Sequence, residues 1–340
     1  MLGAQAQVHS AAVLQLRART ATLPDATLQG LLQQDRSLVR LWALRSTVHL
    51  FPSDDVAALV ALRSHMQHLY HRWICERGGL QPRQMERLLR AVVQALGRQP
   101  MSRGALSRAL TPKLGEWARP WLEHSWGGIL KLAAARGLLC HRPPGAAEEA
   151  EREAHFVRLD QWLGPSTPLT PAAGVAQLLR RYLATYGPAT AADARKFFGI
   201  PAAPLAAAFK RLRRDLLEVE AFGRPHWLLA RDEAVLRDAE PPTGHLAALP
   251  LFDPWLLAHS DNDGFIDPRH RKAVYRTAGW ISPVLLRQGR VVATWSHRRV
   301  AAGWAVEITP LERVSKAEAR QALERLHHLA GGVPVRLQTG

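Results

Sequence analysis

The stretch from Thr170 to Ala230 contains the pattern that most restricts how this chain can fold. Its apolar residues recur at helical spacing until Gly187-Pro188 ends a first helix. Thr190 and Asp193 have the spacing of a capping box, which predicts a second, short helix. A third helix is expected to begin near Pro204, and two strand-like runs joined by a Gly-Arg-Pro turn complete the stretch.

Three helices followed by a hairpin is the element order of a winged helix. In the third helix the apolar residues form one stripe, while Lys210, Arg213 and Arg214 fall mainly on the opposite side. The third helix of such a unit enters the major groove, so we expect these three side chains to contact DNA. The alternative is that they are ordinary surface cations, which are common in this composition.

The same order recurs one unit earlier along the chain. Met85 to Leu96 predicts a first helix, Ser102 is expected to cap a second, and a third is expected from about Pro120 to Arg136. Strands are predicted at residues 137–141 and 154–159, with a wing containing proline and glutamate between them. The repeat is one of architecture and not of residue identity.

The two ends of the chain differ from these units. Within the first 80 residues, helices are predicted at 8–16 and 27–34 and strands at 38–44 and 47–51, so this part resembles a winged helix without a proper first helix. Near the C-terminus a hairpin is predicted around the turn 287–290, followed by a helix over 316–329 and a last strand.

The predicted fold is therefore α+β. It consists of three tandem winged-helix units, the first incomplete, and a small C-terminal α+β domain. The expected domains are residues 1–80, 81–163, 164–245 and 246–340.

Composition narrows the class of protein. No apolar run approaches the length needed to span a bilayer, and the N-terminus lacks the pattern of a signal peptide. Cys75 and Cys140 are the only cysteines, which excludes a disulfide framework or a cysteine-rich metal site. These features suit a cytoplasmic protein.

The chain is strongly basic. Lys and Arg number 45 against 29 acidic residues, which gives a net charge of +16. Such a surface attracts polyanions and gains affinity by releasing their counterions. We expect nucleic acid as the partner and not a membrane, because no basic segment is combined with a strong exposed apolar stripe.

Familiar catalytic signatures are missing from the sequence. It has no phosphate-binding GxxxxGK loop, no nucleophile elbow and no zinc-deaminase motif. His65, His68 and His71 are spaced by three on a predicted helix, which favours a solvated or phosphate-facing surface over a metal site. Asp54-Asp55 is interpreted as a helix cap. We expect neither a metal nor a cofactor.

The remaining candidate is Gln5-Ala6-Gln7. A glutamine amide donates and accepts hydrogen bonds, so it can hold a water molecule in one orientation. Side chains two positions apart diverge on a helix and project to the same side of an extended segment. A catalytic role for Gln5 and Gln7 therefore requires an extended or turn backbone, and the alternative is two ordinary exposed polar side chains.

Several stretches of the sequence are similar to the winged-helix DNA glycosylases of the AlkZ/YcaQ type. They occur in the same order as in that family and cover nearly the whole chain, at Leu2–Gln7, Arg45–His49, Tyr182–Asp193, Leu249–Asp261 and Gly289–Trp295.

This resemblance implies tandem winged helices around a basic channel for duplex DNA and the excision of alkylated purines. The AlkZ branch also unhooks interstrand crosslinks. The family's catalytic motif is QxQ in that branch and QxD in the YcaQ branch, so Gln5 and Gln7 are the implied catalytic pair. Family members carry a helix-containing segment before this motif, whereas four residues precede Gln5. Either Met1 is not the native start, or this member lacks part of its first winged helix.

We therefore expect a monomeric, monofunctional DNA glycosylase that acts on duplex DNA with alkylated, N7-substituted purines. Arg45 and His49 near the motif, and Arg287 and Arg290 at the C-terminal hairpin, are further candidates for DNA contacts. His49 can equally be a core histidine, since it falls on a predicted strand. The alternative function is a non-catalytic tandem winged-helix protein, either a transcription regulator or a resistance protein that binds one adduct.

Overall fold

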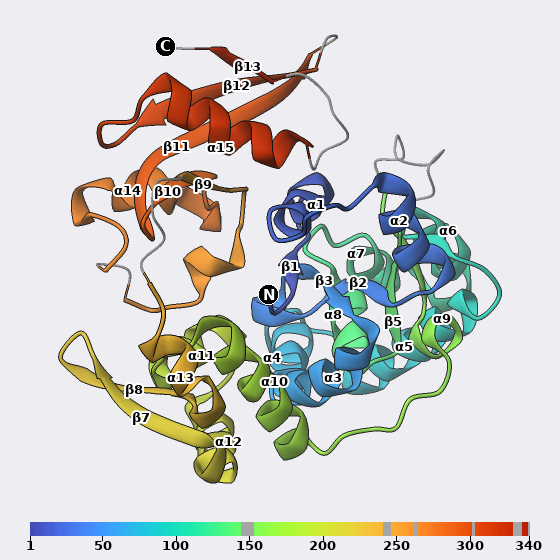
Figure 1. Cartoon of the computed structure of the whole chain (residues 1–340). Helices are drawn as coiled ribbons and strands as arrows, with labels where there is room; N and C mark the ends of the chain where they lie inside the picture. The colour runs from blue at the N-terminus through green and yellow to red at the C-terminus, as the bar shows by residue number, and fades with distance from the viewer. Residues whose placement is uncertain (144–152, 241–245, 262–263, 301–302, 329–334, 339–340) are drawn as a thin grey trace. The chain divides into compact units, whose positions relative to one another are not determined.

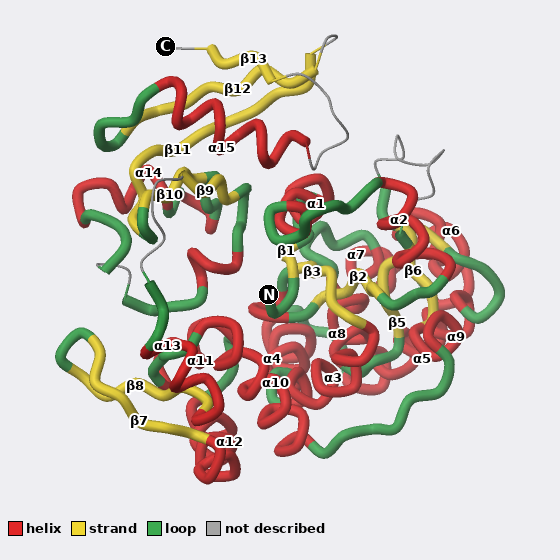
Figure 2. The backbone as a smooth tube through the Cα atoms, in the orientation of Figure 1, coloured by secondary structure: helices red, strands yellow, loops and turns green. Residues whose placement is uncertain are grey.

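The computed structural model describes residues 1–340 except 144–152, 241–245, 262–263, 301–302, 329–334 and 339–340. The chain mixes helices and strands, as Figures 1 and 2 show. It divides into two compact units. The first unit comprises Met1–Leu28, Tyr182–Phe197 and Arg214–Gly340, and the second comprises Gln29–Arg181 and Phe198–Arg213. No described helix is both long enough and apolar enough to cross a membrane.

The first unit contains the N-terminal helix, the short hairpin and the C-terminal sheet. Its elements are β1 (Ala4–Gln5), α1 (His9–Arg17), most of α2 (Asp25–Gln29) and α11 (Ala191–Phe198), β7 (Leu216–Ala221), β8 (Arg224–Leu229), α13 (Glu233–Arg237), β9 (Leu246–Leu249), α14 (Arg271–Val274), β10 (Val284–Arg287), β11 (Arg290–Val300), β12 (Gly303–Pro310), α15 (Lys316–His328) and β13 (Val335–Gln338). Helix α10 (Pro171–Tyr186) is divided between the units after Arg181.

The C-terminal sheet has the order β13-β12-β11-β10-β9 and is antiparallel except between β12 and β13. Alternate side chains of a strand point to opposite faces, and here both faces are buried. Leu285 and Val292 pack in one apolar cluster with the inner face of α15, while Leu286 and Val291 belong to a second cluster on the other side. This explains why the sequence is apolar at consecutive positions in Val284–Leu286 and Val291–Ala293.

The second unit is built on an antiparallel sheet whose strands run in the order β3-β2-β5-β6-β4. Its elements are β2 (Leu38–Trp42), β3 (Val48–Pro52), α3 (Val56–Ser64), α4 (Gln67–Arg72), α5 (Pro82–Leu96), β4 (Met101–Ser102), α6 (Arg103–Leu114), α7 (Arg119–Leu122), α8 (Gly128–Ala135), β5 (Leu139–Arg142), β6 (His155–Arg158), α9 (Leu159–Leu163) and α12 (Ala202–Leu212).

The element order predicted for residues 164–245 is confirmed, as α10, α11, α12, β7 and β8 follow one another. The helices and strands expected near both ends of the chain are also present within a few residues of the expected bounds. The four-part division into domains stays a prediction. The expected wing of residues 142–153 lies largely outside the described residues.

The single helix predicted from Pro120 to Arg136 is wrong. The chain forms α7 and α8 there, and the helix is interrupted before α8, where Gly127 has φ 100° and Gly128, the first residue of α8, has φ 44°. A Cβ atom at Gly128 would lie 2.3 Å from the carbonyl oxygen of Trp121, so only glycine fits. The apolar spacing continues through this turn and conceals it.

Asp55 is also not the helix cap that the sequence suggested. It precedes α3 but its side chain makes no capping hydrogen bond. Its carboxylate is fully buried and accepts a hydrogen bond from Arg181 on α10, at 2.7 Å. Burial raises the pKa of Asp55, and the charge of Arg181 opposes that shift.

Two histidines are buried in the sheet of the second unit. His49 on β3 is 2% exposed and contacts the carbonyl oxygen of Thr47 through Nδ1, at 3.0 Å. His141 on β5 lies against the ring of Trp42, 4.4 Å between centroids. Burial lowers the pKa of His49 to about 3, with a smaller contribution from Arg45, and lowers the pKa of His141 well below its ordinary value. Both are therefore neutral at physiological pH.

The Arg19–Asp253 pair is a second stabilising feature, this time in the first unit. The guanidinium of Arg19 donates two hydrogen bonds to the fully buried carboxylate of Asp253, at 2.8 and 2.7 Å. The same carboxylate accepts a hydrogen bond from the backbone N–H of Trp255 at 2.9 Å. The pair thus joins the end of α1 to the turn after β9.

We predict that acid destabilises the protein through the buried histidines. Their pKa values in the folded state lie below the value in the unfolded state. Their contribution to the free energy of unfolding is therefore fully present above about pH 6.5 and is lost as the pH falls. For His49 the loss approaches about 1.4 kcal/mol per pH unit between roughly pH 6 and its folded pKa of about 3. Urea unfolding between pH 7.5 and 5 should show a flatter dependence for His49→Leu. The exposed-site variant His68→Gln should keep the wild-type slope, and an unchanged slope in His49→Leu would contradict the prediction.

We also predict that Asp253→Asn lowers the free energy of unfolding by about 2–3 kcal/mol, because an amide nitrogen then faces the Arg19 donors. Chemical denaturation with an unchanged m-value would measure this. As a control, Glu116→Gln removes an exposed ion pair with Arg119, 2.8 Å apart, and should have no measurable effect. Equal effects of the two variants would refute the assigned role.

Candidate active site

The segment Gln5-Ala6-Gln7 lies outside helical structure. Gln5 ends the two-residue strand β1, and α1 begins only at His9. The backbone condition set by the sequence analysis for a catalytic QxQ pair is thus met. Gln5 is 6% exposed, whereas Gln7 is exposed.

Gln15 holds this segment in place. Its Oε1 accepts a hydrogen bond from the Gln5 backbone N–H at 2.9 Å, and its Nε2 donates to the Gln5 carbonyl oxygen at 3.2 Å. The same Nε2 donates to the carbonyl oxygen of Leu251 at 2.8 Å. The acceptor and both donor hydrogens of this fully buried amide are therefore committed. Sequence reasoning missed Gln15, although a glutamine on the apolar face of α1 was a usable signal.

Tyr186 at the end of α10 contacts the same segment. The Leu2 backbone N–H lies 3.4 Å from the Tyr186 hydroxyl oxygen, a long hydrogen bond. The ring of Tyr186 packs with those of Tyr182 and Phe197, whose centroids lie 5.5 and 5.2 Å away. Tyr182 in turn donates to the carbonyl oxygen of Ala258 at 2.6 Å. An aromatic cluster therefore supports the chain just before Gln5.

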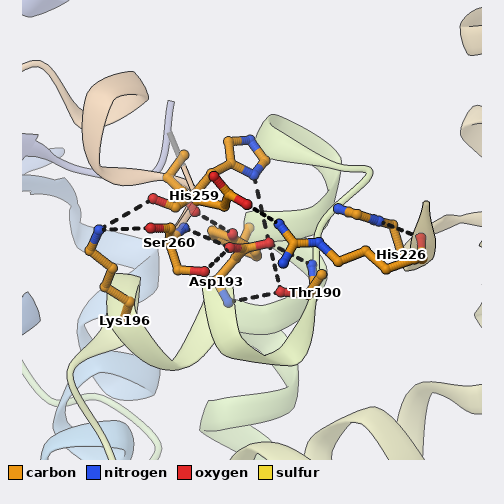
Figure 3. A network of polar contacts seen from close by, with 10 residues as sticks. Thr190, Asp193, Lys196, His226, His259 and Ser260 are labelled. Atoms are coloured by element: carbon orange, nitrogen blue, oxygen red, sulfur yellow. Dashed lines mark hydrogen bonds and ion pairs between the residues drawn. The ribbon is translucent and has the colours of Figure 1, made fainter. Parts of the chain in front are cut away.

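Asp193 on α11 is the centre of a polar network, shown in Figure 3. The predicted capping box is confirmed, because the Thr190 hydroxyl accepts from the Asp193 N–H at 3.1 Å and the carboxylate accepts from the Thr190 N–H at 2.8 Å. The carboxylate also accepts from the Ser260 N–H and hydroxyl, both at 2.6 Å. His259 Nδ1 lies 3.8 Å from it.

These donors keep the carboxylate of Asp193 ionised. Burial alone would raise its pKa, but the His259 imidazole and the hydrogen bonds from Ser260 and Thr190 outweigh burial and hold the pKa well below its usual range. Lys196 adds weaker contacts to the carbonyl oxygens of His259 and Ser260, at 3.5 and 3.4 Å (Figure 3). The network fastens two of the motif segments, 182–193 and 249–261, to each other.

The cationic residues expected to bind DNA on the third helix are at the surface. Lys210, Arg213 and Arg214 are all exposed at the end of α12 and in the turn that follows it. Arg211, which the sequence analysis did not select, is equally exposed. Exposure makes these side chains available to phosphate groups.

Arg45 and His49 belong to the second unit. Arg45 is half-buried and has φ 51°. Gly199 lies so close that a Cβ atom added to it would be 3.1 Å from the Cα of Arg45. The backbone of Arg45 is thus closely packed. His49 was interpreted either as a DNA contact or as a histidine packed in the core, and its burial favours the core position.

Arg287 and Arg290 flank the turn between β10 and β11, where Gln288 and Gly289 have φ 50° and 78°. Arg287 donates to the Glu318 carboxylate at 3.1 Å and to the Arg313 carbonyl oxygen at 3.0 Å. Arg290 is exposed. Of the two, Arg290 is the better placed for a nucleic-acid contact.

The three histidines spaced by three in the sequence belong to the second unit. His65 follows α3, and His68 and His71 lie on α4. Within the described residues no group of three or more His, Cys, Asp or Glu side chains is close enough to hold a metal ion.

Comparison with known proteins covers almost the entire chain. The profile of the AlkZ-like DNA glycosylases matches residues 1–331. An interstrand DNA cross-link repair glycosylase of Streptomyces sahachiroi is 30% identical over 302 residues, which cover 87% of this chain and 80% of that protein. The solved structure of the Streptomyces sahachiroi DNA glycosylase AlkZ is similar with a TM-score of 0.83 and 27% identity, covering 99% of this chain and 91% of that one. The chain therefore belongs to the AlkZ-like family of DNA glycosylases.

Proposed function

We propose that this glycosylase excises N7-alkylated purines from duplex DNA as a monomer and unhooks interstrand crosslinks that involve such bases. The crosslink activity is suggested by the name of the Streptomyces sahachiroi relative. Gln5 and Gln7 are the proposed catalytic residues. The proposed mechanism uses neither a metal nor a covalent enzyme intermediate, so its product is an abasic site.

The chemistry suits two neutral amides. A purine alkylated at N7 already carries a positive charge, so it is a good leaving group. The bond between the sugar C1′ and the base breaks, and its electron pair passes to the base and neutralises it. A water oxygen then bonds to C1′ and releases its proton to solvent. The two amides hold that water and stabilise the oxocarbenium-like sugar by their dipoles.

One observation carries this proposal: the buried amide of Gln15 brackets both backbone polar groups of Gln5. Catalytic groups must be held in position before reaction, because misplacement by about 1 Å can cost a hundredfold in rate. A buried side chain spent entirely on fixing the backbone at the QxQ motif is the support that such a role requires.

The charge of the chain supports DNA as the substrate. A net charge of +16 provides non-specific affinity, and exposed cations such as Lys210, Arg211 and Arg290 are proposed to contact phosphates. The non-catalytic alternative explains this charge equally well. It gives no reason, however, for a dedicated clamp on the N-terminal glutamine segment.

We predict that Gln5→Ala/Gln7→Ala slows excision by about 10²–10³-fold, because each amide contributes to transition-state stabilisation. A duplex containing 7-methylguanine is incubated with protein and then heated in alkali, so that abasic sites become strand breaks. Gln99→Ala, at an exposed glutamine of the second unit, should leave the rate unchanged. Strand breaks at the wild-type rate from the double variant would refute the assignment.

We further predict that Gln15→Met lowers the rate of excision at least tenfold while duplex binding stays within about twofold. The Met side chain fills similar space but cannot bracket the Gln5 backbone. Single-turnover rates and fluorescence anisotropy on the same duplex separate the two quantities. If affinity and rate fell together, Gln15 would act on DNA binding instead of positioning the motif.

A further inference from the structure

The first unit contains a cavity of about 600 Å³ that the proposed catalytic segment does not use. It is bounded by two hairpin turns, those of β7–β8 and β10–β11, and by the end of α10. Its volume is in the range of sites for drug-sized ligands, roughly 300–1,000 Å³.

Aromatic side chains form much of the wall of this cavity. Tyr186, Phe222, Trp255 and Phe265 all line it, and the rings of Trp255 and Phe265 lie 4.6 Å apart at 57°. Trp255 and Phe265 thus pack against each other, and the aromatic surface that the four side chains turn to the cavity can stack with a planar ligand. The cavity is therefore suited to a planar aromatic group.

Phe222 is held in an unusual state. It is 83% exposed at the tip of the β7–β8 hairpin and has φ 53°, followed by Gly223 with φ 70°. Such turns favour Asn or Asp at the first position, and a bulky residue with positive φ is strained. The other turn at the cavity has the polar Gln288 in the equivalent conformation. Strain combined with exposure of a large apolar ring indicates function and not packing.

A glycine leaves room for this ring. A Cβ atom at Gly264 would lie 3.2 Å from Cε1 of Phe222, so a side chain there would press on the phenyl group. Gly264 also lines the cavity.

The polar groups of the cavity are largely paired with one another. Arg224 donates to the Asp261 carboxylate at 2.7 Å, and the ionised carboxylate of Asp193 is engaged by Ser260 and Thr190. A ligand is then recognised mainly through its aromatic faces. Arg224 offsets the charge of Asp261, and the carboxylate of Asp193 adds a further negative charge, which disfavours an anionic ligand and tolerates a neutral or cationic one.

One residue that lines the cavity, Tyr186, also contacts the chain just before the QxQ motif. The hydroxyl of this residue is within 3.4 Å of the Leu2 N–H, three residues before Gln5. Tyr186 therefore connects the cavity to the segment that carries the QxQ motif.

From these observations we propose that the cavity binds the planar aromatic substituent of a bulky DNA adduct. This proposal rests on the proposed glycosylase function. The aromatic part of the alkylating agent, and not the damaged base itself, is held between Phe222 and the Trp255 side of the cavity. Lesions with a planar aromatic substituent are thereby preferred over simple methylated bases.

The first experiment uses the full chain without DNA and proflavine, a planar cationic fluorophore, as the probe. Saturable binding is expected, with about tenfold weaker affinity for Phe222→Ala and near wild-type affinity for Phe222→Tyr, which retains the ring. Trp126→Ala is the matched control, because Trp126 is 71% exposed in the second unit and does not line the cavity. No saturable binding, or equal binding by wild type and Phe222→Ala, would overturn the proposal.

The second experiment compares two duplexes, one with 7-methylguanine and one with a guanine carrying a polycyclic aromatic group at N7. The ratio of kcat/KM for the aromatic adduct to that for 7-methylguanine should fall about tenfold in Phe222→Ala. An equal loss on both substrates, or no loss, contradicts selective binding of the substituent. If wild-type protein excised neither base, the proposed function would fail, while the proflavine result would still decide whether the cavity binds aromatics.

Discussion

The amide of Gln15 is the interaction on which the candidate site depends. It is buried and joins the backbone of Gln5 to that of Leu251, 236 positions from Gln15 in sequence. The Gln15 side chain is fully buried, so losing one of its hydrogen bonds would leave a buried polar group of the amide unpaired. A helix that is otherwise packed by Ala11 and Leu14 thus also fixes the position of a strand of only two residues.

Asp193 and Asp253 are likewise buried polar side chains whose hydrogen bonds join separate segments of the chain. Each carboxylate is almost fully buried and accepts both main-chain and side-chain hydrogen bonds, Asp193 from Thr190 and Ser260 and Asp253 from Arg19 and Trp255. Neutral apolar packing alone would allow neighbouring loops to slide. Fully satisfied polar groups specify one arrangement of segments, which a site for chemistry requires.

Local signals in the sequence were sufficient for most elements. The capping box of Thr190 and Asp193 and the turn between Arg287 and Arg290 are encoded within a few residues and were predicted correctly. The Gly-Arg-Pro turn was placed too late in the chain, because Arg224 and Pro225 already belong to β8 and the turn lies at Phe222-Gly223. Long-range partners were not predictable. Asp55 meets Arg181 across 126 positions, Arg287 meets Glu318, and nothing near Gln15 in the sequence indicates Leu251. The candidate glutamines came from a family resemblance, whereas their support became visible only in three dimensions.

On the proposed mechanism, the strong positive charge of the chain and the neutrality of the catalytic amides are compatible. Breaking the glycosidic bond of an N7-alkylated purine moves a positive charge from base to sugar and does not create one. The transition state therefore needs orientation of nearby dipoles more than a new counter-charge. Basic side chains can then serve the phosphates without opposing the reaction, and the carboxylates of Asp193 and Asp253 can be committed to structure. A neutral leaving group would lack this advantage, since its departure would require protonation that two glutamines cannot provide.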